Sequence, residues 1–149
     1  YSQNKFGYIN SNEIIQLLPE TKTALEELQK FQKTLETQIQ SMEMELQQSL
    51  QDYQNNLESY SDPLIKQDKE VELQSLQQRI QKFMQDAQEA LQKKEIELTT
   101  PIQDKVQKAI TDVAIEGNYT YIFDKNLAGI LYSKESENIM DKVKKKLNL

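Results

Sequence analysis

Residues 31–57 read FQKTLETQIQSMEMELQQSLQDYQNNL, a stretch without glycine or proline. Its apolar residues recur at steps of four, four and three, an eleven-residue repeat of about 3.67 residues per turn. This pattern predicts one long helix from about residue 19 to about residue 58, with one side facing a partner. The apolar stripe consists of Phe31, Leu35, Ile39, Met42, Leu46, Leu50, Tyr53 and Leu57.

A second long helix is predicted from about residue 63 to about residue 116. Asp62 can cap its start, and Pro63 can occupy its first position. Two helices with the same period and a short link predict an antiparallel coiled-coil hairpin. Pro101 lies inside the second helix, where we expect a kink or hinge. The second stripe consists of Leu76, Ile80, Met84, Ala87, Leu91, Leu98, Ile102, Val106, Ala109 and Val113.

The two ends of the chain carry short β-like segments. Residues 5–10 and 119–124 are aromatic and β-branched and predict strands. Gly117-Asn118 is a stop signal for the preceding helix, and residues 129–132 are predicted as the hairpin partner of 119–124. A closing amphipathic helix is expected from Lys134. Its apolar side consists of Ile139, Met140, Val143 and Leu147.

The predicted fold is therefore mainly α with a small β part. A long helical hairpin arm over residues 19–101 projects from a discontinuous α/β body of residues 1–18 and 102–149. Three short strands form a poor core alone, so we expect the body to be completed by self-association. The residues expected at that contact are Phe6, Tyr8, Tyr119, Tyr121, Phe123, Ile130 and Tyr132.

Composition removes several classes of function. The chain of 149 residues has a net charge of −6, which argues against nucleic acid as the main partner. It contains neither histidine nor cysteine, and the sequence holds no Gly-rich phosphate loop and no metal-ligand cluster. No apolar run of about 18 residues is present, so stable membrane insertion is not expected. We expect no enzyme, no catalytic or metal-binding residue and no cofactor.

Some apolar residues lie beside the stripes or at the link between the helices. Met44, Val71, Phe83 and Ile96 could contact a bound partner, and Met suits promiscuous contacts because it is flexible. Ordinary packing at the edge of the helix seam is the alternative. Tyr60, in the link, either contacts a partner or closes the hairpin.

Several segments resemble the Skp/OmpH family. They are Leu18–Ala24 (LPETKTA), which opens a Gln-rich helix after a short strand, and Leu98–Ile110 (LTTPIQDKVQKAI), which leads into Val113–Tyr119 (VAIEGNY). Residues 121–125, 130–132 and 143–148 also fit. The resemblance covers nearly the whole chain, and the order of elements carries it better than any single motif.

This resemblance implies a homotrimer in which strands form a joint β-barrel body and three arms enclose a cavity. Unfolded outer-membrane proteins are held in that cavity without nucleotide, so we expect a holdase chaperone. It also implies the periplasm and therefore a mature, processed chain. The sequence given contains no signal peptide, and that absence decides nothing by itself. The alternative is a structural coiled-coil adaptor or spacer with one dedicated partner.

The sequence departs from better-known members of that family in its charge. Those members are basic, with positive arm tips, whereas the tip region here is acidic. Lipopolysaccharide binding and attraction to acidic clients are therefore not carried over to this chain. The charged residues of the tip are Glu58, Asp62, Asp68, Glu70 and Glu72 against Lys66 and Lys69.

Overall fold

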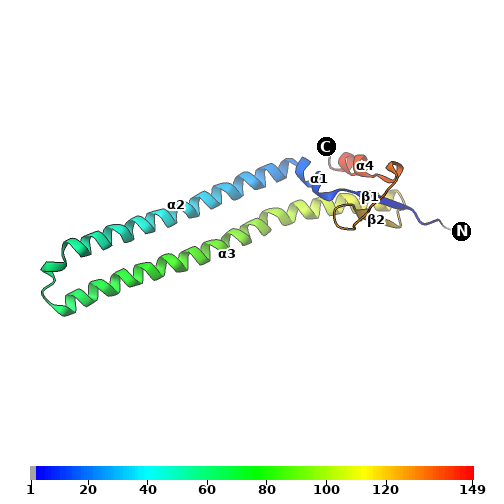
Figure 1. Ribbon diagram of the computed structural model, residues 1–149. Coiled ribbons are helices and arrows are strands. Elements are labelled where there is room, and N and C mark those ends of the chain that lie inside the picture. Colours follow the sequence, from blue (N-terminus) through cyan, green and yellow to red (C-terminus); the bar gives the residue numbers. More distant parts are fainter. Residues whose placement is uncertain (1–2) are drawn as a thin grey trace. The chain divides into compact units, whose positions relative to one another are not determined.

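The computed structural model describes residues 3–149, which form a mainly helical fold with one small sheet (Figure 1). Two compact units are present. The terminal unit comprises the described residues up to Glu26 together with Ile96–Leu149, and the hairpin unit comprises Glu27–Glu95. In chain order, the elements are β1 (Phe6–Ile9), α1 (Ser11–Leu17), α2 (Pro19–Asn55), the 3-10 turn η1 (Leu57–Ser59), α3 (Pro63–Glu116), β2 (Tyr121–Asp124), the 3-10 turn η2 (Glu135–Glu137) and α4 (Met140–Lys146).

Local signals set the helix ends where the sequence predicts them. Pro19 and Pro63 occupy the first positions of α2 and α3, and the Asp62 carboxylate accepts a hydrogen bond from the Leu64 N–H at 2.8 Å. After α3 ends, Asn118 adopts a positive φ of 54°, a left-handed conformation that stops a helix. The cap of α1 is Asn10, whose side chain accepts from the Glu13 N–H.

Helix α3 continues through Pro101 without a break, within the bounds that the sequence predicts. Proline removes one backbone hydrogen bond, and the residues on either side keep the helical backbone. A role of Pro101 as a hinge stays a prediction.

In the hairpin unit, α2 and α3 pack against each other in opposite directions (Figure 1). Tyr53 near the end of α2 bonds Glu70 near the start of α3, and Glu27 near the start of α2 pairs with Lys94 much later in α3. Between these contacts lies a buried cluster of Met42, Leu76 and Ile80. The apolar stripes therefore meet along a shared seam, as the sequence predicts.

Two stripe positions are wrong. Leu57 is exposed, because α2 ends at Asn55 and Leu57 lies in η1. Met84 is also exposed, and its neighbour Phe83 packs against the buried cluster instead. For Met84 the physical reason is the spacing of the seam. From Leu73 to Lys94 the covered residues of α3 are separated by three and four residues in turn, so the step after Ile80 reaches Phe83. The covered residues of α2 keep the predicted eleven-residue rhythm.

The sheet of the terminal unit joins the two ends of the chain. β1 and β2 pair in parallel, with Phe6 opposite Tyr121 and Ile9 opposite Asp124. The first predicted strand therefore meets a strand more than 100 residues later in the chain. The second edge of β1 is also occupied, because the Ile139 N–H donates to the Tyr8 carbonyl at 3.1 Å.

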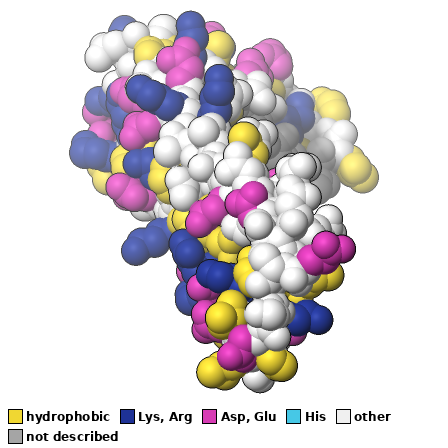
Figure 2. Space-filling model, turned by 90° about the vertical axis from the view of Figure 1, so that its left-hand side faces the viewer, with side chains coloured by type: hydrophobic (Ala, Val, Ile, Leu, Met, Phe, Trp, Pro, Cys, Tyr) yellow, Lys and Arg dark blue, Asp and Glu magenta, His cyan; other side chains and the backbone are white. Residues whose placement is uncertain are grey.

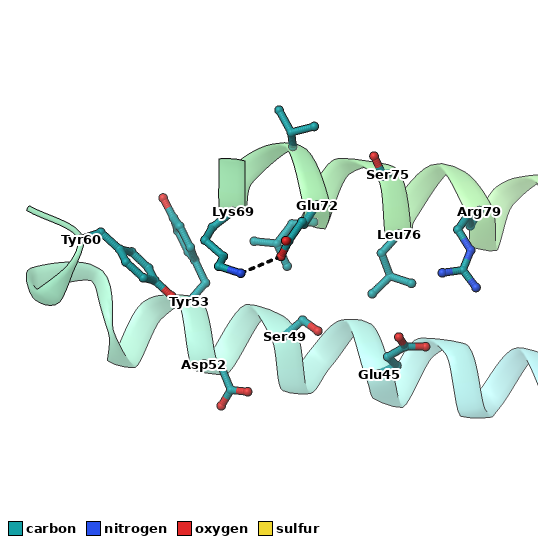
Figure 3. A pocket seen from close by; sticks show the side chains of 12 residues that line it. Glu45, Ser49, Asp52, Tyr53, Tyr60, Lys69, Glu72, Ser75, Leu76 and Arg79 are labelled. Atoms are coloured by element: carbon teal, nitrogen blue, oxygen red, sulfur yellow. Dashed lines mark hydrogen bonds and ion pairs between the residues drawn. The ribbon is translucent and has the colours of Figure 1, made fainter. Parts of the chain in front are cut away.

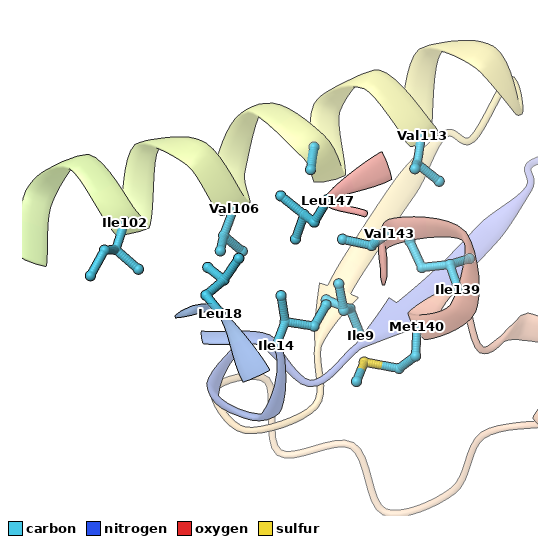
Figure 4. Close-up of a cluster of buried hydrophobic side chains, with 11 residues drawn as sticks. Ile9, Ile14, Leu18, Ile102, Val106, Val113, Ile139, Met140, Val143 and Leu147 are labelled. Atoms are coloured by element: carbon cyan, nitrogen blue, oxygen red, sulfur yellow. The ribbon is translucent and has the colours of Figure 1, made fainter. Parts of the chain in front are cut away.

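One hydrophobic core holds the terminal unit together (Figure 4). Side chains from β1, α1, α3 and α4 converge in it, and Ile14 and Val143 are fully buried. The expected apolar side of the closing helix is confirmed, because all four of its residues are buried here. The core consists of Ile9, Ile14, Leu18, Ile102, Val106, Ala109, Val113, Ile139, Met140, Val143 and Leu147.

The predicted third strand is wrong. Residues 129–132 form no strand, and the part of the chain that the structure describes contains a two-stranded sheet. The N–H groups of Leu127 and Ala128 both bond the Asp124 carbonyl, so the chain makes a turn there instead of folding back as a hairpin. Leu131 and Tyr132 are 101% and 81% exposed. Residues 129–132 therefore stay outside the sheet, and no described strand pairs with the outer edge of β2.

The closing helix begins at Met140 rather than at the predicted Lys134. The preceding residues are held by β1 instead. The Ile139 N–H bonds Tyr8, and the Tyr8 hydroxyl donates to Glu135 at 3.1 Å. The Asn138 side chain then accepts from the Met140 N–H at 3.0 Å and thereby supports the start of α4.

The core makes a quantitative prediction. Ile14→Ala should lower the free energy of unfolding by about 2–5 kcal/mol, because it removes a side chain with 0% exposure from a packed core. The matched control is Ile115→Ala, because Ile115 is 70% exposed on α3 and should change stability by less than about 0.5 kcal/mol. Guanidinium denaturation followed by circular dichroism measures both. Equal losses would contradict this core.

Candidate functional site

The exposed face of the sheet carries a cluster of aromatic rings. Side chains alternate along a strand, so the paired residues Phe6, Tyr8, Tyr121 and Phe123 share one face while Ile9 and Ile122 face the core. The rings of Phe6, Tyr121 and Phe123 lie with centroids 6.0–6.2 Å apart, and all three are exposed. We call these three residues the sheet aromatic cluster.

The other aromatic residues expected at a subunit contact have different surroundings. Tyr8 is buried, with Lys125 Nζ 5.1 Å from its ring centroid. Tyr119 and Ile130 are half-buried, and Tyr132 is exposed. The structure therefore brings Phe6, Tyr121 and Phe123 together and places Tyr8 and Tyr119 inside the chain's own packing.

Two lysines from opposite ends of the chain hold Tyr119, a contact that sequence reasoning missed. Lys5 Nζ lies 4.3 Å from the ring centroid, and Lys142 Nζ donates to the Tyr119 hydroxyl at 2.9 Å. A side chain at Gly117 would collide with this ring, so the glycine allows the close approach. Pairs this distant in sequence leave no local signal.

A pocket of about 500 Å³ lies in the hairpin unit near the link between α2 and α3 (Figure 3). Tyr53 and Tyr60 lie at one end, with ring centroids 5.8 Å apart, and Glu45 and Arg79 lie at the other. The lining combines apolar and charged side chains: Tyr53, Tyr60, Val71, Leu73 and Leu76 with Glu45, Asp52, Lys69, Glu72 and Arg79.

The strongest electrostatic perturbation in this pocket is at Tyr53. Its hydroxyl donates to Glu70 Oε1 at 2.6 Å, a contact that sequence reasoning also missed. That hydrogen bond to Glu70, with smaller contributions from desolvation and from the carboxylate charge, raises the pKa of Tyr53 to about 12. Lys69, beside it, pairs with Glu72 at 3.0 Å.

The residues predicted to contact a client divide into two groups. Met44, Val71 and Ile96 are exposed, so their side chains are accessible to a partner. Phe83 packs against the seam cluster, and Tyr60 is half-buried against Tyr53. Val71 and Tyr60 also line the pocket.

Among residues 3–149, no three His, Cys, Asp or Glu side chains are placed to hold a metal ion. No helix in that range has the length and apolar character needed to cross a membrane. The surfaces described above combine exposed apolar side chains with exposed charge.

The Tyr53–Glu70 hydrogen bond makes a testable prediction. Glu70→Gln should lower the pKa of Tyr53 from about 12 toward its usual value, because the charged acceptor is lost. The absorbance of tyrosinate during alkaline titration measures this pKa, with Tyr53→Phe in both backgrounds isolating Tyr53 from the other tyrosines. An unchanged pKa would contradict the bond.

Because the pKa of Tyr53 is raised on folding, its hydrogen bond to Glu70 stabilises the fold fully below about pH 10, and this stabilisation is lost as the pH rises through about 12.

A comparison with curated protein sequences gives no match. A crystal structure of an OmpH-like protein from Caulobacter crescentus CB15, provisionally described as an outer membrane chaperone, matches with a TM-score of 0.82 at 11% sequence identity. The match covers 99% of this chain and 86% of that one, and it shows a shared fold. Residues 5–147 match the family described as outer membrane protein (OmpH-like), so this chain belongs to the OmpH-like family.

Proposed function

We propose that this protein is an ATP-independent holdase chaperone that binds unfolded outer-membrane β-barrel proteins and prevents their aggregation. Family membership suggests the chaperone role. The observation that carries the mechanism is the exposure of single apolar side chains along two long helices, which Met44, Val71 and Ile96 exemplify.

These contacts are individually weak. A fully buried large apolar side chain contributes roughly 1.5–3 kcal/mol, and a shallow contact on a helix surface gains only part of that. Several contacts must therefore act together on one client. Such a surface tolerates many sequences and releases them without nucleotide, because no single contact dominates the affinity.

We further propose that three copies associate through the terminal unit, with residues 1–18 and 102–149 as the body and residues 19–101 as the arm. The sheet aromatic cluster supports this, because exposed rings on a small sheet favour burial against another copy. The outer edge of β2 supports it too, since no described strand of the chain pairs with that edge. Leu131 and Tyr132 could then find in a neighbouring copy the contact they lack here.

The same proposal places the protein in the periplasm, where unfolded outer-membrane proteins need protection. In this assembly Pro101 would serve as the hinge of each arm, because its missing N–H weakens the helix locally. A flexible arm would let the assembly adapt to clients of different size.

We expect the protein to suppress light scattering when an unfolded outer-membrane β-barrel protein is diluted from urea. The triple variant Met44→Ser, Val71→Ser, Ile96→Ser should suppress scattering less, because its exposed apolar contacts are gone. The matched control, Gln48→Ser, Gln74→Ser, Gln92→Ser, changes exposed polar residues of the same helices and should act as wild type.

Two results would count against this function. One is the absence of suppression by the wild type at every salt concentration. The other is suppression of a single client protein and none of unrelated unfolded proteins, which a dedicated adaptor would give.

A further inference from the structure

Negative charge is concentrated in one part of the chain. From here on, the tip region means residues 43–72, which add the last turns of α2 to the acidic residues of the tip described above. It holds eight Asp and Glu residues against Lys66 and Lys69, a net charge of −6. The rest of the chain is balanced, with 16 acidic and 16 basic residues. The whole net charge of −6 therefore comes from the end of the hairpin unit where α2 and α3 are joined.

Exposed apolar side chains occur in the same region. Five of its large hydrophobic residues are exposed, and no described segment covers them. Figure 2 views the molecule from the side of this link, and there the hydrophobic side chains lie singly or in small groups between charged ones. The tip region is thus an apolar surface set among carboxylates. Its exposed apolar residues are Met44, Leu57, Leu64, Ile65 and Val71.

Several carboxylates of the tip region are free to meet a partner. Glu70 accepts from Tyr53, Glu72 pairs with Lys69, and Asp62 caps α3. By contrast, the exposed side chains of Asp52, Glu58 and Asp68 make no hydrogen bond or ion pair with any described residue.

We propose that the tip region selects unfolded segments in which Lys or Arg residues are interspersed with apolar residues. This proposal rests on the proposed holdase function and names the class of client segment that this function favours. The aliphatic stem of a Lys or Arg can cover an apolar side chain such as Leu64 or Ile65 while its charge stays near a carboxylate. An acidic segment would meet the same apolar surface and be repelled by its charge.

The charge distribution also determines how the selection depends on salt. Exposed charges attract each other over a Debye length of about 10 Å at 0.1 M salt, which shrinks to about 3 Å at 1 M. The apolar contacts are not weakened in this way. Salt should therefore remove the preference for basic segments while leaving part of the binding.

Fluorescence anisotropy of two labelled unfolded peptides tests the proposal on the full chain. The peptides share their length and apolar residues, and the same polar positions are Lys in one and Glu in the other. At low salt the Lys peptide should bind roughly tenfold more tightly, since several exposed charge pairs act together. In about 0.5 M salt the two affinities should agree within about twofold, because the charges are screened.

A matched pair of variants locates the effect. Asp52→Asn, Glu58→Gln, Asp68→Asn should remove most of the low-salt preference. Glu26→Gln, Glu97→Gln, Asp104→Asn neutralises three exposed carboxylates of the terminal unit and should preserve it. Both variants neutralise three carboxylates, so they change the net charge equally. A difference in their preference for the Lys peptide therefore depends on where the carboxylates lie.

Two results with the wild type would overturn the tip proposal: equal binding of both peptides, or tighter binding of the Glu peptide. Two results with the variants would also overturn it. In one, the tip variant keeps the preference for the Lys peptide, and in the other, both variants lose that preference to the same extent. The light-scattering assay separates this proposal from the holdase function. Suppressed aggregation with equal peptide affinities rejects the tip proposal alone. If the protein prefers the Lys peptide but does not suppress aggregation of the unfolded client, the holdase function alone is rejected.

Discussion

The parallel pairing of β1 with β2 is the constraint on which the rest of the structure depends. It brings residues 6–9 beside residues 121–124, so everything between them must leave the sheet and return to it. Two long helices packed in opposite directions satisfy this requirement. The pairing is fixed by the buried core beneath it, where Ile9, Val113 and Val143 meet. Closing so long a loop costs conformational entropy, which this core must offset.

Local signals made the helices predictable, and distant contacts limited the prediction elsewhere. Pro19, Pro63 and Asn118 act on their own backbone, so the ends of α2 and α3 follow from sequence. Residues 134–139 depend on a distant contact, because Asn138 and Ile139 occupy the second edge of β1. Residues 129–132 leave the sheet because the preceding chain makes a turn on the Asp124 carbonyl. No periodicity contains that information.

The same distinction applies to the candidate site. Exposure of Met44, Val71 and Ile96 was predictable because each lies beside an apolar stripe. The exchange of Phe83 and Met84 depends on how α3 meets α2, which changes the local spacing of the seam. The Tyr53–Glu70 bond arises only when the two helices are aligned. Uncovered apolar area favours a partner, and the proposed function uses this in two ways. In that proposal the clustered rings of the sheet make a lasting contact with another copy, and the scattered side chains of the helices make brief contacts with clients.

Native mass is the most direct measurement of whether this chain completes itself by joining copies. We expect sedimentation equilibrium at micromolar concentration to give about three times the chain mass of 17.5 kDa, as a closed symmetric assembly requires. Replacing Tyr121 and Phe123 with Ser should shift the mass toward that of one chain, since both rings are exposed in the single copy. A wild-type protein that stays at 17.5 kDa would contradict the assembly, and with it the proposal that several arms act together on one client.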